Sequence, residues 1–177
     1  MTRLALVPAL ALLTALTTGC GYNTIQTLDV NADQARSQIE VQLQRRADLI
    51  PNLVRTVERF AQQEQAVFTQ VAQARSGLLN AIQSRDPARM AEANEAVTSA
   101  LGRLMVVVEQ YPQLKSDQNF LQLQDELTGT ENRIAVSRGD YNNAARDYNA
   151  YIRRFPQVLT AKVIGAQPKT FVVFRRC

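Results

Sequence analysis

The chain has no histidine and no tryptophan, and it has only two cysteines, seven glycines and six prolines in 177 residues. Without histidine, a Ser-His-Asp or Cys-His catalytic arrangement, a histidine-ligated zinc site and a Glu-x-x-His di-iron site are all excluded. The scarcity of glycine and proline argues against a sandwich or barrel, which needs many turns, and favours a mainly helical protein. The cysteines lie near opposite ends, at 20 and 177, so we do not expect a disulfide to organise the fold.

The charge of the chain is small, +4 at pH 7, with acidic and basic residues interspersed. Such a balance is typical of a solvated surface rather than of a nucleic-acid interface, so we expect no nucleic-acid partner. We expect no cofactor either. A metal site made of carboxylates alone could be built from Asp125, Glu126, Glu131 and Asp140, but their spacings do not converge on one helix face, so we expect no metal.

The longest pattern is an apolar stripe from Ile39 to Ala81, which recurs at alternating steps of four and three residues. This spacing predicts a long helix with one narrow apolar face. We expect Asn31 or Asp33 to cap its start. Pro51, in its middle, predicts a kink rather than an end, because the stripe keeps its phase across the proline; Asp48 would then cap the resumed segment.

Two more segments repeat the pattern. Asp86-Pro87 is typical of a helix start, and Tyr111-Pro112 of an end. The third helix would begin at Ser116 or Asp117 and end at Phe155-Pro156. Because the connections are short, neighbouring helices should run antiparallel. We therefore predict an all-α fold: an elongated antiparallel bundle of three long helices, or four if the first breaks at Pro51.

The N-terminus has the form of a leader. Arg3 precedes an apolar run from Leu4 to Leu16, which is too short to span a bilayer, where about 20 residues are needed. The residues before Cys20 resemble a bacterial lipoprotein signal, in which the chain is cut before a cysteine that is then acylated, although Thr17 stands where that pattern prefers leucine. An ordinary secretory leader is the alternative. Two or three acyl chains on Cys20 would anchor the protein stably. Gly21 after the cysteine weakly favours the outer over the inner membrane.

The expected organisation is thus a lipoprotein-type signal peptide at 1–19, a lipid anchor and tether at 20–30, and a helical bundle at 31–156. Residues 157–177 form an apolar tail, which we expect to pack on the bundle as an extended segment or a short helix. Its end, Arg175-Arg176-Cys177, should be mobile.

Two charged residues, Arg46 and Glu64, interrupt the apolar stripe of the first helix. They lie too far apart on one helix to pair, about 27 Å. A buried charge needs a partner or water, so we expect contacts to the third helix, where Glu131, Arg133 and Arg138 are candidates. Either these contacts fix the helix register, or the polar positions form a groove that holds a partner.

The sequence then shows a family resemblance. Tyr22-Asn23 and the string Gln44-Arg45-Arg46-x-Asp48-Leu49-Ile50-Pro51-Asn52-Leu53-Val54 resemble the N-terminal signature of the LemA family. The second half matches as well, in Tyr111-Pro112-x-Leu114-Lys115, Phe120-x-x-Leu123-Gln124, Glu131-Asn132-Arg133-Ile134-Ala135, Arg138, Tyr141-Asn142, Tyr148-Asn149 and Phe155-Pro156. The resemblance spans roughly residues 22–174. It implies a membrane-attached helical bundle that faces outward from the cytoplasm, and it brings no catalytic residues. Many members carry an uncleaved transmembrane helix where this chain has the lipoprotein-like leader.

We therefore expect a non-enzymatic, lipid-anchored protein of the bacterial cell envelope that faces the periplasm and acts as a structural or adaptor bundle. It would bind the membrane through Cys20 and an envelope protein through its surface. The alternatives are an enzyme or enzyme subunit that uses carboxylates and tyrosines on the bundle surface, and a docking partner of an envelope protease. The polar residues with expected structural or partner-binding roles are Arg46, Asp48, Asn52, Glu64, Glu131, Asn132, Arg133, Arg138, Tyr141, Asn142, Tyr148 and Asn149.

Overall fold

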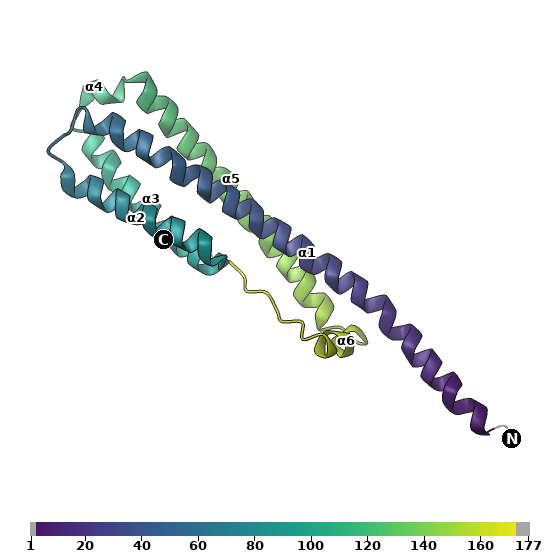
Figure 1. Cartoon of the computed structure of the whole chain (residues 1–177). Helices are drawn as coiled ribbons and strands as arrows, with labels where there is room; N and C mark the ends of the chain where they lie inside the picture. The colour runs from purple at the N-terminus through teal and green to yellow at the C-terminus, as the bar shows by residue number, and fades with distance from the viewer. Residues whose placement is uncertain (1–2, 173–177) are drawn as a thin grey trace. The chain divides into compact units, whose positions relative to one another are not determined.

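The structure, a computed structural model, describes the backbone of residues 3–172 and the side chains of residues 21–172. Over these residues the fold is all-α, as predicted, with no strand. Six helices follow one another (Figure 1): α1 (Arg3–Glu58), α2 (Gln65–Ser84), α3 (Pro87–Val108), α4 (Pro112–Lys115), α5 (Gln118–Ile152) and α6 (Gln157–Val163). The predicted number of three or four long helices was wrong. None of the helices in the described part is both long enough and apolar enough to cross a bilayer.

The chain divides into two compact units. The first, which we call the terminal unit, consists of Met1–Ala35 and Asp140–Phe171. The second, the bundle unit, consists of Arg36–Gly139 together with the chain from Val172. The long helices α1 and α5 contribute residues to both units, while α2, α3 and α4 belong to the bundle unit and α6 to the terminal unit.

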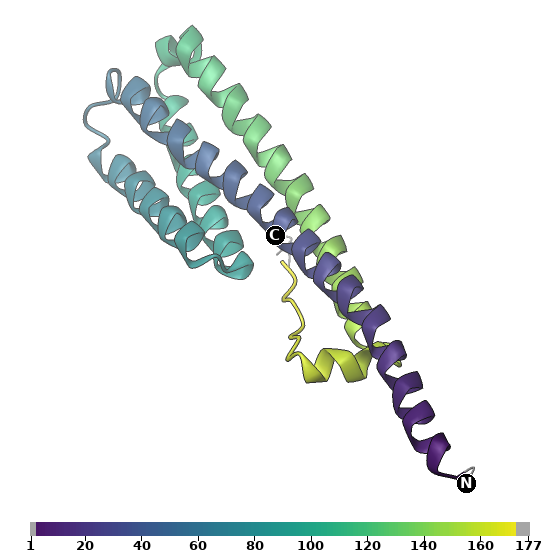
Figure 2. The same cartoon turned by 45° about the vertical axis from the view of Figure 1, so that its right-hand side comes forward.

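The bundle unit is built from the C-terminal part of α1, from α2 and α3, and from the N-terminal part of α5, with α4 in the connection that precedes α5. α2 and α3 form a hairpin, and both views show them side by side (Figures 1 and 2). Apolar side chains from all four long segments fill the core, each stabilising it by roughly 1.5–3 kcal/mol. Those with 1% exposure or less include Leu43, Ile50, Leu53, Val57, Val71, Leu78, Met90, Val97, Leu104 and Ile134.

The stretch predicted as one helix from Ile39 to Ala81 is two helices. α1 continues through Pro51 and ends at Glu58, and α2 begins at Gln65. The break therefore lies seven residues beyond the proline, and Asp48 caps nothing because it lies inside α1. No glycine or proline marks residues 59–64, so the local sequence carries no signal for the turn. Ala61 is buried at this corner with 1% exposure, and backbone hydrogen bonds from Ala61 to Val57 and from Glu64 to Ala61, each at 3.0 Å, close the turn.

The other helix ends follow their sequence signals. The Asp86 side chain accepts hydrogen bonds from the backbone N–H groups of Ala88 at 2.9 Å and Arg89 at 3.5 Å, and Pro87 is the first residue of α3, as predicted. Of the two candidate caps for the third predicted helix, Asp117 is the one used, since its Oδ1 accepts from the N–H of Phe120 at 2.9 Å. The short helix α4 was not predicted.

The start predicted at Asn31 or Asp33 was also wrong, because both residues lie inside α1. The sequence did contain the signal: the four-three stepping continues backward from Ile39 through Ala32, Leu28 and Ile25, and Ala32 and Ile25 are buried. The predicted acylation of Cys20 and the predicted mobility of residues 175–177 fall outside the described side chains, and both stay predictions.

In the terminal unit, α1 and the C-terminal part of α5 pack with α6 and the extended chain that follows it. Its core is a small cluster of Ile25, Tyr148, Ile152 and Ala161, against which Leu28, Tyr151 and Ala166 pack. The tail thus combines both predicted forms, with a helix over Gln157–Val163 and an extended segment after Gly165, whose φ of +70° is readily adopted only by glycine.

Candidate functional site

Arg46 forms the centre of a buried polar cluster in the bundle unit. Only 4% of it is exposed. Its Nη1 donates to the Glu131 carboxylate and, at 2.5 Å, to Oδ1 of Asn94, while Nη2 donates to the Thr98 hydroxyl at 3.1 Å. Asn94 Nδ2 completes the cluster by donating to Glu131 Oε1 at 3.4 Å. One guanidinium therefore joins α1, α3 and α5, and its acidic partner is Glu131, one of the candidates expected on the third predicted helix.

A second buried guanidinium lies in the same unit. Arg138 on α5 is 5% exposed, and the charges of Glu131 and Glu95 favour its cationic form. Burial lowers the pKa of Arg46 and of Arg138, Glu131 opposes this in both, and Arg138 lowers the pKa of Arg46 further. Both side chains nevertheless remain cations near neutral pH, because a guanidinium does not lose its proton in proteins. Two buried cations thus depend on nearby carboxylates for compensation.

Pro51 is accommodated by an arginine of the neighbouring helix. A proline has no N–H to donate to the carbonyl four residues earlier, which here belongs to Ala47. The Nε of Arg75, on α2, donates to that carbonyl oxygen at 2.7 Å. The hydrogen bond lost within α1 is therefore replaced by one between α1 and α2.

The terminal unit contains a second polar cluster, centred on Lys169. Its Nζ lies 2.9 Å from carboxylate oxygens of both Asp29 and Asp33 on α1, and 5.4 Å from the ring centroid of Tyr148. Burial acts to lower the pKa of Lys169, but the hydrogen bonds and charges of the two aspartates outweigh it, so the pKa is raised. The pKa of Tyr148 is raised, chiefly by burial and next by the charge of Asp29. The charge of Lys169 acts in the opposite direction. A fully charged Lys169 thus ties the tail to α1.

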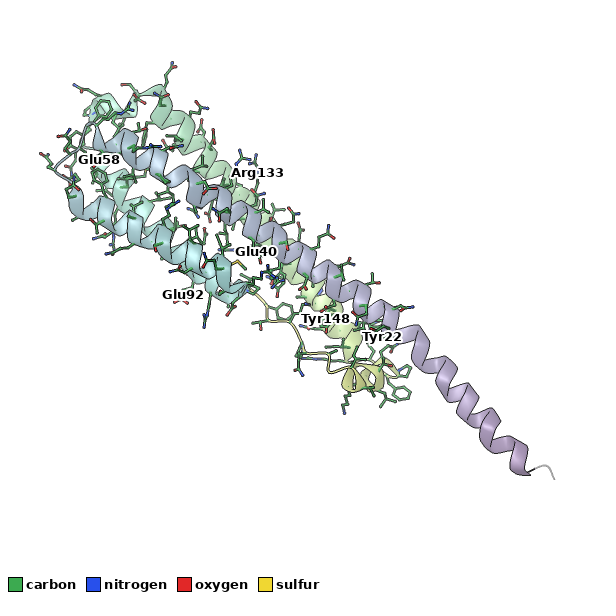
Figure 3. All side chains as sticks on the ribbon, in the orientation of Figure 1. Tyr22, Glu40, Glu58, Glu92, Arg133 and Tyr148 are labelled. Atoms are coloured by element: carbon green, nitrogen blue, oxygen red, sulfur yellow. The ribbon has the colours of Figure 1, made fainter. Side chains whose placement is uncertain are left out.

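The backbone of the tail is held by α5. Asn149 donates from Nδ2 to the carbonyl of Lys169 and accepts at Oδ1 from its N–H, each at 2.8 Å. About two helical turns before Asn149 on α5, the hydroxyl of Tyr141 donates to the carbonyl of Thr170 at 3.0 Å. We call residues 165–171 the strap. Tyr141, Tyr148 and Asn149 are all buried in this unit, and Figure 3 shows Tyr148 on α5.

The other predicted polar residues differ in their exposure and in their place in the fold. Asp48 and Asn52 are exposed on α1, where Asp48 accepts from Gln44 and Asn52 from Arg55. Glu64 is half-buried at the N-terminus of α2, where its side chain makes no capping bond, so its predicted place within a long helix was wrong. On α5, Asn132 and Arg133 are exposed and Asn142 is half-buried.

Sequence reasoning missed several participants: Asp29, Asp33, Arg75, Asn94, Thr98 and Lys169. Asn94 had a detectable signal, because it is a polar residue at a stripe position of the second predicted helix. Lys169 and Arg75 had none, because each acquires its role from a segment distant in sequence. Chemically, both clusters hold helices or backbone together. In the described part, no three acidic or cysteine side chains lie close enough to hold a metal ion.

The outer face between α1 and α5 in the bundle unit is hollowed. A hollow of about 700 Å³ is lined by Arg45 from α1 and, from α5, by Gln118, Leu121, Gln122, Asp125, Glu126, Gly129 and Arg133. Arg133 is exposed and is labelled on α5 in Figure 3.

Known proteins resemble this chain over most of its length. Two curated relatives are magnetosome proteins: MamQ 2 of Paramagnetospirillum magneticum, 31% identical over 167 residues, and MamQ of Magnetospirillum gryphiswaldense, 30% identical over 167 residues. Each match covers 81% of this chain and 61% of the relative. Protein LemA of Metamycoplasma hominis is 27% identical over 121 residues, or 68% of this chain and 54% of that protein. The chain thus spans about three fifths of the length of the magnetosome relatives.

A sequence profile of the LemA family matches residues 35–176, which include α2 to α6 and the strap. The resemblance that the sequence motifs suggested is therefore confirmed at the level of the family. By this match, the chain belongs to the LemA family.

Proposed function

We propose that this protein is a non-enzymatic, lipid-anchored component of the bacterial cell envelope that acts as a structural or adaptor helical bundle. Acylated Cys20 would hold it in the membrane, with the bundle facing the periplasm and the outer membrane weakly favoured. The observation that carries the proposal is the engagement of the buried polar groups: the Arg46 cluster joins three helices, and the Lys169 cluster fastens the strap. These groups stabilise the fold, which leaves the helix surfaces to bind a partner.

The enzyme alternative requires carboxylates and tyrosines that are free to react. Tyr141 and Tyr148 are 4% and 3% exposed, and the hydroxyl of Tyr141 is bonded to the strap. Their burial supports the adaptor over the enzyme. A metal ion that stays bound to the purified full-length chain through dialysis against chelator would favour the enzyme instead.

The anchor is tested with two cysteine variants expressed as full chains in bacteria. Cys20→Ser should abolish incorporation of a clickable fatty acid and release the protein from the membrane fraction, because a thiol is the acylated group. Cys177→Ser is the matched control and should behave like the parent. If Cys20→Ser is processed, labelled and membrane-bound like the parent, the lipid anchor is wrong.

The adaptor role is tested by crosslinking in intact cells, followed by mass spectrometry of the purified adducts. An adaptor should give one or a few reproducible envelope partners, linked through exposed helix faces. An envelope protease among them would identify the docking alternative. Crosslinks to no particular protein would reduce the role to passive scaffolding.

A further inference from the structure

We infer that the outer face of α5 in the bundle unit binds a second copy of this chain, with two α5 helices antiparallel and crossing at Gly129. This inference does not depend on the lipid anchor or on the adaptor role. It rests on the order of residues along one helix face, on their exposure and on their charges.

The face is self-complementary about Gly129. Asp125 precedes the glycine by four residues and Arg133 follows it by four, so the two charges lie about 6 Å from it on opposite sides. In an antiparallel pair, a two-fold axis at Gly129 places Asp125 of each copy opposite Arg133 of the other. The charges therefore match without any second surface.

The apolar residues of the face follow the same symmetry. Leu121 lies eight residues before Gly129 and Val136 seven after it, and the helical repeat of about 3.6 residues places both on the Gly129 side of α5. They are 44% and 64% exposed, so both side chains are accessible to a second copy. The axis that pairs the charges brings Leu121 of one copy beside Val136 of the other.

The hollow has the electrostatics expected of a self-association surface. It contains two cations, Arg45 and Arg133, and two carboxylates, Asp125 and Glu126, and is thus close to neutral. Within the described part of the chain, none of the four takes part in an ion pair. A surface that binds a nucleic acid or an anionic membrane carries an excess of positive charge. A surface with equal numbers of both charges can instead pair with the same surface of a second copy.

Gly129 allows a close approach of the two helices. A Cβ added at this position would meet nothing within 4 Å, so the glycine is not required by contacts inside the bundle unit. An α-helical glycine costs about 1 kcal/mol relative to alanine. Its position at the centre of the charge pattern lets two backbones come together there.

The first test is disulfide trapping with the full chain in intact cells, in a Cys177→Ser background. Gly129→Cys places the thiol at the axis, within reach of its own symmetry mate, since a disulfide needs Cα atoms about 4.4–6.8 Å apart. Oxidation should yield a covalent homodimer. Gly77→Cys, on α2, is the matched control, because the space around that glycine is equally open, and it should stay monomeric. Equal trapping of both variants, trapping of neither, or a disulfide from Gly129→Cys to another protein would overturn the inference.

The second test exchanges charges, with dimerisation of the full chain measured by analytical ultracentrifugation in detergent. Asp125→Arg or Arg133→Asp alone places like charges opposite each other and should raise the dimer Kd about tenfold. The double variant Asp125→Arg/Arg133→Asp regenerates the pairs and should restore the Kd to within about threefold. Circular dichroism confirms the fold of each variant. Additive weakening in the double variant, or no dimer in the parent chain, would refute the pairing.

Discussion

The Nε of Arg75 on α2 donates to the carbonyl oxygen of Ala47 on α1 at 2.7 Å, and this is the carbonyl that Pro51 leaves without a helical donor. The proline in the LemA-type string therefore does not end the helix. It redirects one backbone hydrogen bond from within α1 to a contact between two helices. A local break in hydrogen bonding thus becomes a tertiary contact.

This relationship predicts an energetic coupling between Arg75 and Pro51. Arg75→Met should lower the free energy of unfolding by about 1–3 kcal/mol, because it leaves the Ala47 carbonyl without a donor in a part-buried position. In a Pro51→Ala background, the new N–H supplies that donor, and the same change should cost about 1 kcal/mol less. Urea unfolding, followed by circular dichroism, measures the free energy of unfolding of the parent chain, of each single variant and of the double variant. Arg103→Met, which removes an exposed bond to Gln70, is the control and should cost under about 0.5 kcal/mol. Equal costs in both backgrounds would contradict the coupling.

The Arg46 cluster predicts a larger loss. Arg46→Met removes the cation that satisfies Asn94 and Glu131, and should lower the free energy of unfolding by about 3 kcal/mol. Glu131→Gln should cost less, because 41% of the Glu131 side chain is exposed and water can solvate what remains. The same urea titrations measure both, with Arg103→Met as reference. A loss for Arg46→Met no larger than that reference would show that the cluster contributes little to stability.

The strap predicts a local effect. Asn149→Ala removes both hydrogen bonds to the Lys169 backbone and should increase amide hydrogen exchange in peptides covering residues 165–171, while exchange in α2 and α3 stays unchanged. Asn149→Asp keeps the hydrogen-bond acceptor and loses the donor. Its exchange rate in residues 165–171 should therefore lie between that of the parent chain and that of Asn149→Ala. Asn143→Ala, an exposed position on the same helix, is the control. Faster exchange throughout the chain would mean that Asn149 supports the whole fold rather than the strap.

The raised pKa of Lys169 predicts a loss of stability in alkali. The folded state holds the proton more tightly than the unfolded chain does, so this contribution is complete below the ordinary pKa of 10.5 and disappears as the pH rises through the folded value. The raised pKa of Tyr148 acts in the same direction above its ordinary 10.0. Unfolding free energies at pH 8 and pH 11 should therefore differ more for the parent chain than for Lys169→Met.

Tyr148→Phe separates the two groups. If Lys169 carries most of the effect, this variant keeps most of the alkaline loss. A parent chain and a Lys169→Met variant with the same dependence between pH 8 and pH 11 would rule out the contribution of the lysine.

The sequence by itself determined the helical class, the LemA resemblance and those boundaries that depend on local chemistry. Asp86-Pro87 and Asp117 start helices because a side-chain oxygen next to a free N–H acts within a few residues, whatever the rest of the chain does. The periodic apolar faces predicted the core for the same reason: helical periodicity is a property of consecutive residues.

The tertiary structure decided everything that depends on segments distant in sequence. The stripe from Ile39 to Ala81 kept its phase across the turn at 59–64, so the pattern could not reveal where α1 ends. Charge made Glu131 the acidic candidate for Arg46, but Asn94 and Thr98 could be recognised as its further partners only once α1, α3 and α5 were packed together. Lys169 acquired a role only when the strap reached Asp29 and Asp33. A buried charge requires a partner, but which residue serves depends on distances of a few ångströms, and only packing sets those distances.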